Sequence, residues 1–336
     1  MATSLKDYNG TVLDGMLGFL WRQWSALGVA GYGGQSHRHY ADPEAALMLL
    51  CACGRYDARL FDEALDWLVK YERFVNVQRL RTMIGQEPCT GAAVLSGVAR
   101  FLAKRTKQRR WESLSSPKAS TAEPVPLFLG RDGRPLPVLT EPDPDFLHAG
   151  LLRGPALLRG HSGFRTAGKG VALTRLRALL GVNARCEILL FLMTHPFGYP
   201  RRIATETHYA QKTIHDALDD MALSGFIRAI KGKRERLCRL ETRELAKTLL
   251  DKGAAPEWVN WPRVLGALDQ AWSALDALAR DEADPLLAES QAQAIADALT
   301  LRLHGVTTLP ELSAPKTDPL AAALLPFQQV LKLLEG

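Results

Sequence analysis

The clearest periodic pattern of apolar residues in this chain begins at Asn183. Apolar side chains then recur at helical spacing for about three turns, Asn183 is a suitable N-cap, and Pro196 lies just beyond the last turn. A shorter stretch of the same kind follows, with Ile203 on its apolar side. We therefore expect two consecutive helices, over residues 183–195 and 201–207.

A third helix is predicted over residues 211–223, after a three-residue turn. Ile214, Leu218 and Met221 recur at i, i+4 and i+7 and give this segment a single apolar stripe. Gly225 lies just past its end, where glycine is a favoured helix terminator. The pattern predicts a helix with one face in a core.

Two short runs typical of β-strands follow, over residues 226–230 and 236–240. They flank a polar turn with a central glycine, so they predict a β-hairpin. Six basic residues fall within twelve positions here: Arg228, Lys231, Lys233, Arg234, Arg236 and Arg239. Only Glu235 opposes them. Such a cationic hairpin suits phosphate oxygens, because neutralising a nucleic-acid backbone releases counterions.

The same stretch carries a family resemblance. The residues that carry it are Ile203, Ala204, the run 208–214, Leu218, Met221 and the run 224–227. In this order they resemble the winged helix-turn-helix transcriptional regulators of the ArsR and MarR type. The resemblance covers residues 183–240 only.

The resemblance implies a DNA-binding site. In such regulators the third helix enters the major groove with its N-terminal residues on base edges, while the wing contacts the DNA backbone. Carried over by position, the side chains against bases are Gln211, Lys212, Thr213 and His215. The basic side chains of the second helix and the wing that complete the site are Arg201, Arg202, Lys231, Lys233, Arg234 and Arg236.

Three carboxylates, Asp216, Asp219 and Asp220, lie on the predicted recognition helix. A carboxylate can accept a hydrogen bond from cytosine N4, but it is repelled by phosphates. Two interpretations follow. Either only the first turn of the helix touches bases and the acids point sideways, or the module is a structural winged helix that contacts proteins. We favour the first.

The pattern of apolar residues also predicts helices in the amino-terminal part, over residues 11–28, 45–53, 60–71, 75–84 and 90–104. Asp42-Pro43-Glu44 is a strong helix start. The segment around residues 75–84 could be a second, degenerate helix-turn-helix, with Leu80 buried and with Arg79 and Arg81 facing outward. A plain helical bundle for partner contacts is the equally good alternative.

Two further basic stretches flank a linker. The first lies before Trp111 and comprises Arg100, Lys104, Arg105, Lys107, Arg109 and Arg110. It suggests a second contact with the DNA backbone. Residues 113–150 read as a linker with a possible β-hairpin. The basic, glycine-rich stretch after it, from Arg153 to Lys169, predicts either an arm along DNA or an irregular cover over the winged module.

The carboxyl-terminal part predicts three helices, over residues 263–280, 286–304 and 318–334. Leucine and alanine dominate them. These helices can cover one another, but appended helices of this kind also build dimers, and a two-fold dimer places two recognition helices about 34 Å apart on DNA. We therefore expect a homodimer.

Composition adds limits to this picture. The chain of 336 residues is 47% hydrophobic and 23% charged, with a net charge of +6, which fits a globular protein with anionic partners. Its start lacks a signal-peptide pattern, no run is apolar enough for a membrane span, and its five cysteines fit no disulfide scaffold. We expect a cytoplasmic location and no membrane partner.

Catalytic and metal-binding motifs are not found. Gly-x-Ser-x-Gly, His-Glu-x-x-His and phosphate-loop patterns are missing. Cys51 and Cys53, with His37 and His39, could only form an unusual zinc site, because no Cys-x-x-Cys pair supports it. We expect no enzyme activity, no cofactor and no metal.

The sequence thus predicts a mainly α protein in four parts: a helical N-terminal domain (1–112), the linker (113–150), a winged helix-turn-helix (151–250) and a C-terminal helical bundle (251–336). The expected function is that of a sequence-specific transcriptional regulator, most simply a homodimeric repressor that binds double-stranded DNA. The alternatives are a protein-interaction adaptor and an antitoxin-like regulator with a protein partner.

Overall fold

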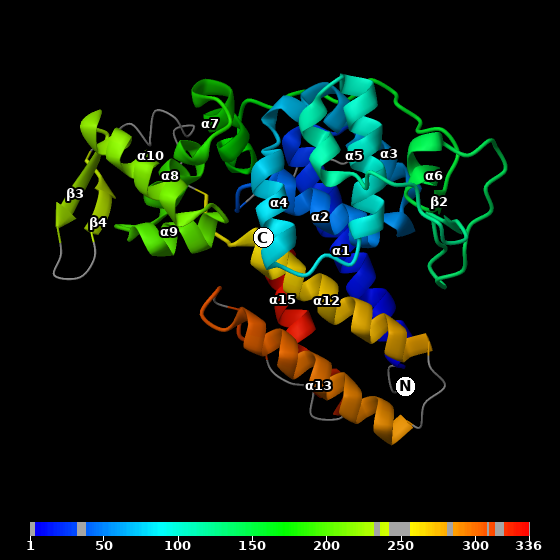
Figure 1. The fold of residues 1–336 in the computed structure, drawn as a ribbon. Coiled ribbons are helices and arrows are strands. Elements are labelled where there is room, and N and C mark those ends of the chain that lie inside the picture. Colours follow the sequence, from blue (N-terminus) through cyan, green and yellow to red (C-terminus); the bar gives the residue numbers. More distant parts are fainter. Residues whose placement is uncertain are drawn as a thin grey trace.

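The computed structural model describes residues 4–31, 38–231, 236–241, 256–280, 285–307, 309–312 and 319–335. Within these ranges the chain is mainly helical, which confirms that part of the prediction. Figure 1 shows a central group of helices, a second group ending in a β-hairpin on one side, and a long helical arm below them.

The central group is built around one helix. It comprises α1 (Leu5–Leu27), α2 (Pro43–Cys53), α3 (Ala58–Tyr71), α4 (Val77–Gln86), α5 (Ala92–Thr106) and α6 (Pro144–His148). Every residue of α2 is buried, because α1, α4 and α5 all pack against it. Asp42 starts α2 as predicted: its side chain accepts hydrogen bonds from the N–H groups of Glu44 and Ala45. Short 3-10 helices lie at Gly54–Tyr56, Glu72–Phe74, Arg109–Leu114 and Lys169–Val171.

The C-terminal helices pack on the N-terminal ones. They are α12 (Trp261–Arg280), α13 (Pro285–Leu303), α14 (Pro319–Ala323) and α15 (Leu325–Glu335). The apolar stripe of α12, with Leu268 and Leu275, is buried against α1 and α2 of the same chain, and α15 also packs on α1. The last predicted helix is divided in two, because Pro326 has no N–H to continue the hydrogen-bond ladder.

The predicted linker lies against the central group. Strand β1 (Val125–Pro126) pairs in parallel with β2 (Leu151–Leu152), and Leu129 and Pro135 form a small antiparallel bridge between them in sequence. The first half of the basic stretch that follows neither extends as an arm nor covers the helices and strands of residues 184–240. Both sequence-based predictions for this half are therefore wrong. This half runs along α3, where Arg153 and Arg159 pair with Asp62 and Glu63.

The second group begins after this stretch. Its elements are α7 (Ala172–Leu180), α8 (Ala184–Thr194), α9 (Pro200–Thr207), α10 (Gln211–Leu223), β3 (Ile227–Lys231) and β4 (Arg236–Leu240). Asn183 caps α8 by accepting from the N–H of Arg185, and Gly225 takes a left-handed conformation (φ 77°) after α10, as the sequence predicts. β3 and β4 pair antiparallel. Three helices followed by a hairpin thus occupy residues 184–240.

Candidate nucleic-acid interface

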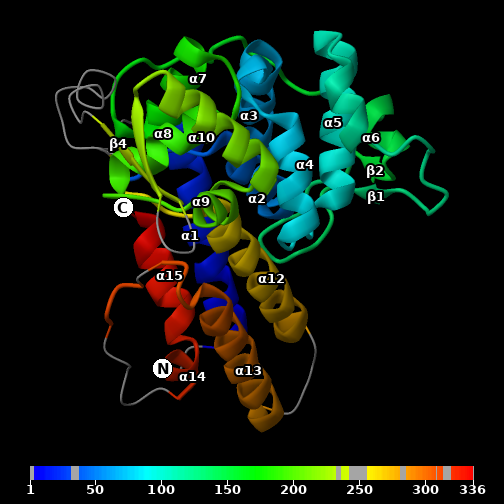
Figure 2. The ribbon, with the colours of Figure 1, turned by 60° about the vertical axis from the view of Figure 1, so that its left-hand side comes forward.

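The side chains expected on base edges lie together at the start of α10. Gln211, Lys212, Thr213 and His215 are exposed, whereas Ile214 among them is fully buried. This alternation follows from helix geometry, because α10 turns its apolar stripe towards α8 and α9. Figure 2 shows α10 at the front of the view. The structure therefore brings the four predicted side chains onto one open turn.

The same turn is electrostatically open to an anion. Ala210 occupies the N-cap of α10, where it makes no side-chain hydrogen bond, and the first turn contains no acidic residue. The first N–H groups of a helix carry a partial positive charge that caps or carboxylates normally offset. Here neither is present, so this helix end favours a negatively charged partner.

The three carboxylates of α10 are each paired with a basic side chain. Asp216 accepts from Lys212 at 2.7 Å, and Asp220 accepts from Arg185 of α8 at 2.6 Å. Asp219 contacts His215 and also Arg236 at the start of β4. Exposed pairs of this kind add little stability in water. Their effect is on charge, because they leave no uncompensated acid on the exposed face of α10.

Arg236 is held differently from the other predicted phosphate contacts. Its guanidinium lies on Asp219, and its side chain is only 26% exposed. The ion pair lowers the pKa of Asp219, which keeps that carboxyl charged. Arg236 therefore connects the hairpin to α10 in the structure, and its charge is already engaged.

The remaining predicted cations surround α10. Arg201 and Arg202 are exposed on α9, and Arg202 lies over the ring of Phe191. Lys231 is the last residue of β3, opposite Arg236. Lys233 and Arg234 lie outside the described residues. So do residues 242–252, for which the sequence pattern predicts a further helix.

A buried ionic network fixes this three-helix group on the central helices. Arg177 of α7 donates to both oxygens of Glu44 on α2, at 2.7 and 2.8 Å, and also to Glu187 on α8. Arg79 of α4 donates to Glu44 and to a third carboxylate of the network, that of Asp42. All five side chains are at most 2% exposed. A network this dry resists rearrangement, because separating its charges leaves them unpaired in a low dielectric.

Arg79 also corrects a sequence prediction. We expected Arg79 to face outward on a degenerate helix-turn-helix, but it is one of the most deeply buried side chains of the structure. Its guanidinium pairs with the carboxylates of Asp42 and Glu44, which are distant in sequence. The sequence could not reveal this, because the partners lie on another helix.

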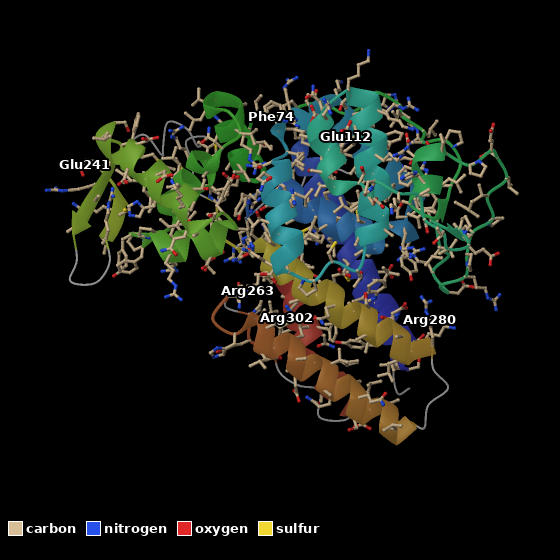
Figure 3. All side chains as sticks on the ribbon, viewed as in Figure 1. Phe74, Glu112, Glu241, Arg263, Arg280 and Arg302 are labelled. Carbon is tan, nitrogen blue, oxygen red and sulfur yellow. The ribbon has the colours of Figure 1, made fainter. Side chains whose placement is uncertain are left out.

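The turn between α9 and α10 also contacts the central helices. Arg79 donates to the carbonyl oxygen of Thr207, and Asn76 donates to the hydroxyl of Tyr209. His208 takes a left-handed conformation (φ 58°), and its ring nitrogens lie 2.9 Å from Gln86 Oε1 and 2.9 Å from Asn260 Oδ1. Phe74, whose carbonyl oxygen accepts from Arg177, marks this junction in Figure 3. The start of α10 is thus held by the central helices.

Burial shifts the pKa values of two groups in the junction. Burial would raise the pKa of the Asp42 carboxyl, but the adjacent Arg79 guanidinium lowers it to about 2. Burial, together with the same guanidinium, lowers the pKa of His208 to about 4. At neutral pH the junction therefore contains a charged Asp42 and a neutral His208.

The other basic run contributes less free charge than expected. Arg100 and Lys104 pair with Asp145, and Arg110 pairs with Glu72, all within the central group. These three side chains connect α5 and the segment after it to their neighbours. The prediction of a second backbone contact there loses these three of its six cations to ion pairs within the central group, and a fourth, Arg109, lies 3.8 Å from Glu112.

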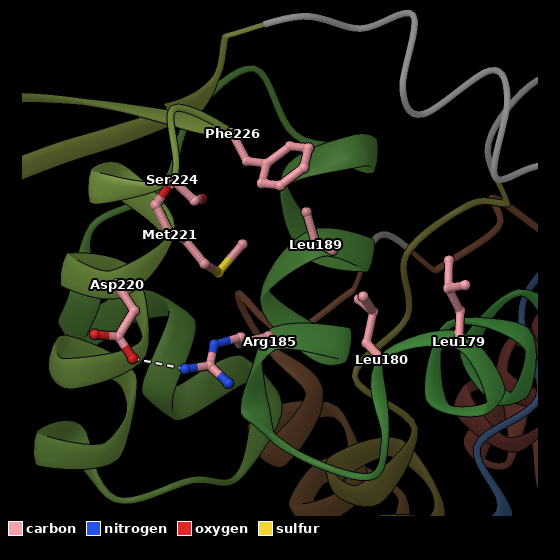
Figure 4. Close-up of a pocket in the computed structure, with 8 residues that line it drawn as sticks. All are labelled: Leu179, Leu180, Arg185, Leu189, Asp220, Met221, Ser224 and Phe226. Atoms are coloured by element: carbon pink, nitrogen blue, oxygen red, sulfur yellow. Dashed lines mark hydrogen bonds and ion pairs between the residues drawn. The ribbon is translucent and has the colours of Figure 1, made fainter.

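An apolar groove lies at the opposite end of α10, and sequence analysis did not anticipate it. Its volume is about 380 Å³, and its lining residues are Leu179, Leu180, Arg185, Leu189, Asp220, Met221, Ser224 and Phe226. Figure 4 shows Met221, Leu189 and Phe226 around a common space, with the Arg185–Asp220 pair at one edge. Leu179 and Phe226 are at least half exposed. The groove arises where α7, α8, α10 and the hairpin meet.

Within the part of the chain that the structure describes, no cluster of three or more His, Cys, Asp and Glu side chains is arranged to hold a metal ion. Cys51 and Cys53 are buried, and burial raises their thiol pKa values well above the usual range. No helix among the described residues combines the length and apolar character that a bilayer crossing requires.

Comparison with known proteins finds no relative. No protein-family description matches the chain, and neither a curated protein nor a solved structure matches it.

Proposed function

We propose that this protein binds double-stranded DNA and regulates transcription, with α8, α9, α10 and the β3–β4 hairpin acting as a winged helix-turn-helix. The observation that carries the proposal is the exposed first turn of α10, where Gln211, Lys212 and Thr213 face solvent beside an uncapped helix end. A recognition helix contacts base edges with this part of its length.

Neutralised carboxylates on α10 support the proposal further. Three free acids would repel a phosphate backbone, but Asp216, Asp219 and Asp220 each have a cationic or imidazole partner on the structure. Sequence preference would come from Gln211, Lys212, Thr213 and His215. Affinity would come mainly from basic side chains on phosphates, which release counterions.

The buried junction gives the proposed site a rigid base. Because the turn before α10 is bonded to α4 and to Asn260, the helix cannot swing independently of the central group. A fixed helix loses less conformational entropy on binding than a mobile one.

We propose a homodimer as the regulatory form, acting most simply as a repressor. One recognition helix offers only three or four side chains to base edges, and a two-fold dimer doubles the sequence that is read. The described part of the α12 stripe is covered within its own chain, so the dimer would use another surface.

The groove favours a second candidate function, which is contact with a protein partner. Exposed apolar patches often mark such contacts, and Leu179 and Phe226, which line the groove, are both at least half exposed. An adaptor would use this groove alone, whereas an antitoxin-like regulator would use both the groove and the start of α10.

Size-exclusion chromatography with a mixed-sequence 30-base-pair duplex separates these functions. At 50 mM salt and micromolar protein, a DNA-binding protein co-elutes with the duplex and returns to its own position at 500 mM salt. Elution that is unchanged by the duplex at 50 mM salt would remove the DNA-binding proposal and leave the adaptor.

A further inference from the structure

Asp219 lies between a side chain proposed to read bases and the hairpin. Its Oδ2 atom is 3.2 Å from Nδ1 of His215, one turn earlier on α10, and its Oδ1 atom contacts the guanidinium of Arg236 on β4. The carboxylate is therefore shared by the exposed face of α10 and the hairpin. This geometry has a consequence for recognition that rests on the proposed DNA-binding function.

The carboxylate decides which nitrogen of His215 carries the proton. An ionised carboxylate only accepts hydrogen bonds, so a ring nitrogen facing it must donate. With Arg236 on its other oxygen, Asp219 stays ionised and stays in place. Neutral His215 is then protonated on Nδ1, and its Nε2 atom is a bare acceptor.

Other charges near His215 do not reverse this arrangement. Lys212, on the preceding turn of α10, is bonded to Asp216, and Arg236 on β4 is bonded to Asp219 itself. Both cations therefore have carboxylate partners, and Asp219 is the carboxylate that contacts the imidazole. His215 is 53% exposed, which leaves its edge open to a ligand.

A bare Nε2 atom selects a particular base chemistry. In the major groove, cytosine N4 and adenine N6 are exocyclic amino groups that donate, whereas guanine N7 and O6 and thymine O4 only accept. We infer that Asp219 is a positioning residue that sets His215 as an acceptor for the exocyclic amino group of cytosine or adenine. Arg236 completes the arrangement by holding Asp219 against the hairpin.

In water the exposed pair of His215 and Asp219 is weak, but binding to DNA excludes solvent and strengthens it.

Selection of duplexes from a random pool at pH 8.0 tests the inference. At pH 8.0 the wild-type protein should enrich cytosine or adenine about tenfold at one position, and His215→Ala should lose the enrichment at that position alone. Asp219→Asn should shift the same position towards guanine or thymine, because Arg236 retains the amide oxygen and the amide NH2 group then donates to Nδ1 of His215.

Controls separate positioning from folding and from the parent proposal. Arg236→Gln removes the guanidinium that holds Asp219 but leaves the carboxylate beside His215, so it should weaken the preference for cytosine or adenine at pH 8.0 without reversing it. Thermal unfolding identifies any variant that fails to fold. Duplexes in which purine replaces the selected adenine, or pyrimidin-2-one the selected cytosine, lack only the amino group and should lose the enrichment.

Two results would overturn the inference, and they differ in what else they remove. If Asp219→Asn folds and keeps the wild-type base preference at pH 8.0, Asp219 does not position His215, although DNA binding survives. If the wild-type protein enriches no duplex at pH 8.0, sequence-specific binding fails and the inference fails with it.

Discussion

Arg177, near the end of α7, donates two hydrogen bonds to the carboxylate of Glu44, near the start of α2, at 2.7 and 2.8 Å. Both side chains are fully buried, and they are separated by 133 residues of sequence. This pair joins the helices of the proposed DNA-binding module to the central helices. The orientation of α10 in the whole molecule depends on it, together with the contacts around His208.

Removal of Arg177 should destabilise the protein strongly. Arg177→Met leaves the buried carboxylates of Glu44 and Glu187 without their shared partner, and breaking a buried pair costs about 3–5 kcal/mol. Arg185→Met, which breaks the exposed pair with Asp220, should cost less than about 1 kcal/mol. Urea unfolding followed by circular dichroism measures both. Equal effects of the two variants would show that the network does not hold the module.

Acid should destabilise the folded protein through His208. The folded pKa is about 4 and the usual value is 6.5, so between these values the unfolded chain binds a proton that the folded chain does not. Stability is therefore complete above pH 6.5 and falls as the pH drops towards 4. Between pH 7 and pH 5 the His208 contribution amounts to about 2 kcal/mol.

Comparison with His208→Asn isolates this contribution, since asparagine tolerates the left-handed backbone at this position. The difference in unfolding free energy between pH 7 and pH 5 should be about 2 kcal/mol smaller in the variant than in the wild type. A pH dependence that is the same in both proteins would be inconsistent with a buried, neutral His208.

Local patterns predicted the helices of the module well. The apolar stripe of Ile214, Leu218 and Met221, the N-cap at Asn183 and the glycine after α10 depend only on neighbours in sequence, and each lies where it was expected. The same holds for the α2 start at Asp42. Such features follow from helical periodicity and capping, which act over a few residues.

Features that depend on distant partners could not be predicted. An arginine on an amphipathic helix normally faces water, so Arg79 was expected outside, but carboxylates brought together by the fold allow it to be buried. Arg236 was expected along phosphates for a similar reason, yet its nearest carboxylate is Asp219 on another element. The groove beside Phe226 likewise requires four elements to meet before it exists.

The position of Arg236 predicts a specific salt dependence. The double variant Arg236→Gln/Asp219→Asn removes one positive and one negative charge, so it leaves the net charge unchanged. If the guanidinium stays on Asp219 in the complex, the slope of log K against log salt should match that of the wild type. Fluorescence anisotropy with a labelled duplex measures the slope, and a decrease of about one would place Arg236 on a phosphate instead.

A charge in the groove should leave DNA binding intact. Leu180 is the last residue of α7 and lines the groove beside the far end of α10. Leu180→Glu adds a carboxylate there, so the affinity for a duplex should stay within about threefold of the wild type. Thr213→Glu places the same group in the first turn of α10 and should reduce affinity more than tenfold. A larger loss of affinity from Leu180→Glu than from Thr213→Glu would indicate that DNA binds at the groove and not at the first turn of α10.

The most direct test of the central claim is a salt titration of duplex binding with Lys212→Glu and with Arg134→Glu. Lys212 is exposed on the first turn of α10, and Arg134 is equally exposed in the segment between β1 and α6. Figure 1 shows α6 on the side of the molecule opposite the hairpin. We predict that Lys212→Glu lowers affinity at least tenfold at 100 mM salt and reduces the slope of log K against log salt by about one, while Arg134→Glu changes neither. Identical curves for the two variants would contradict a DNA interface at the start of α10.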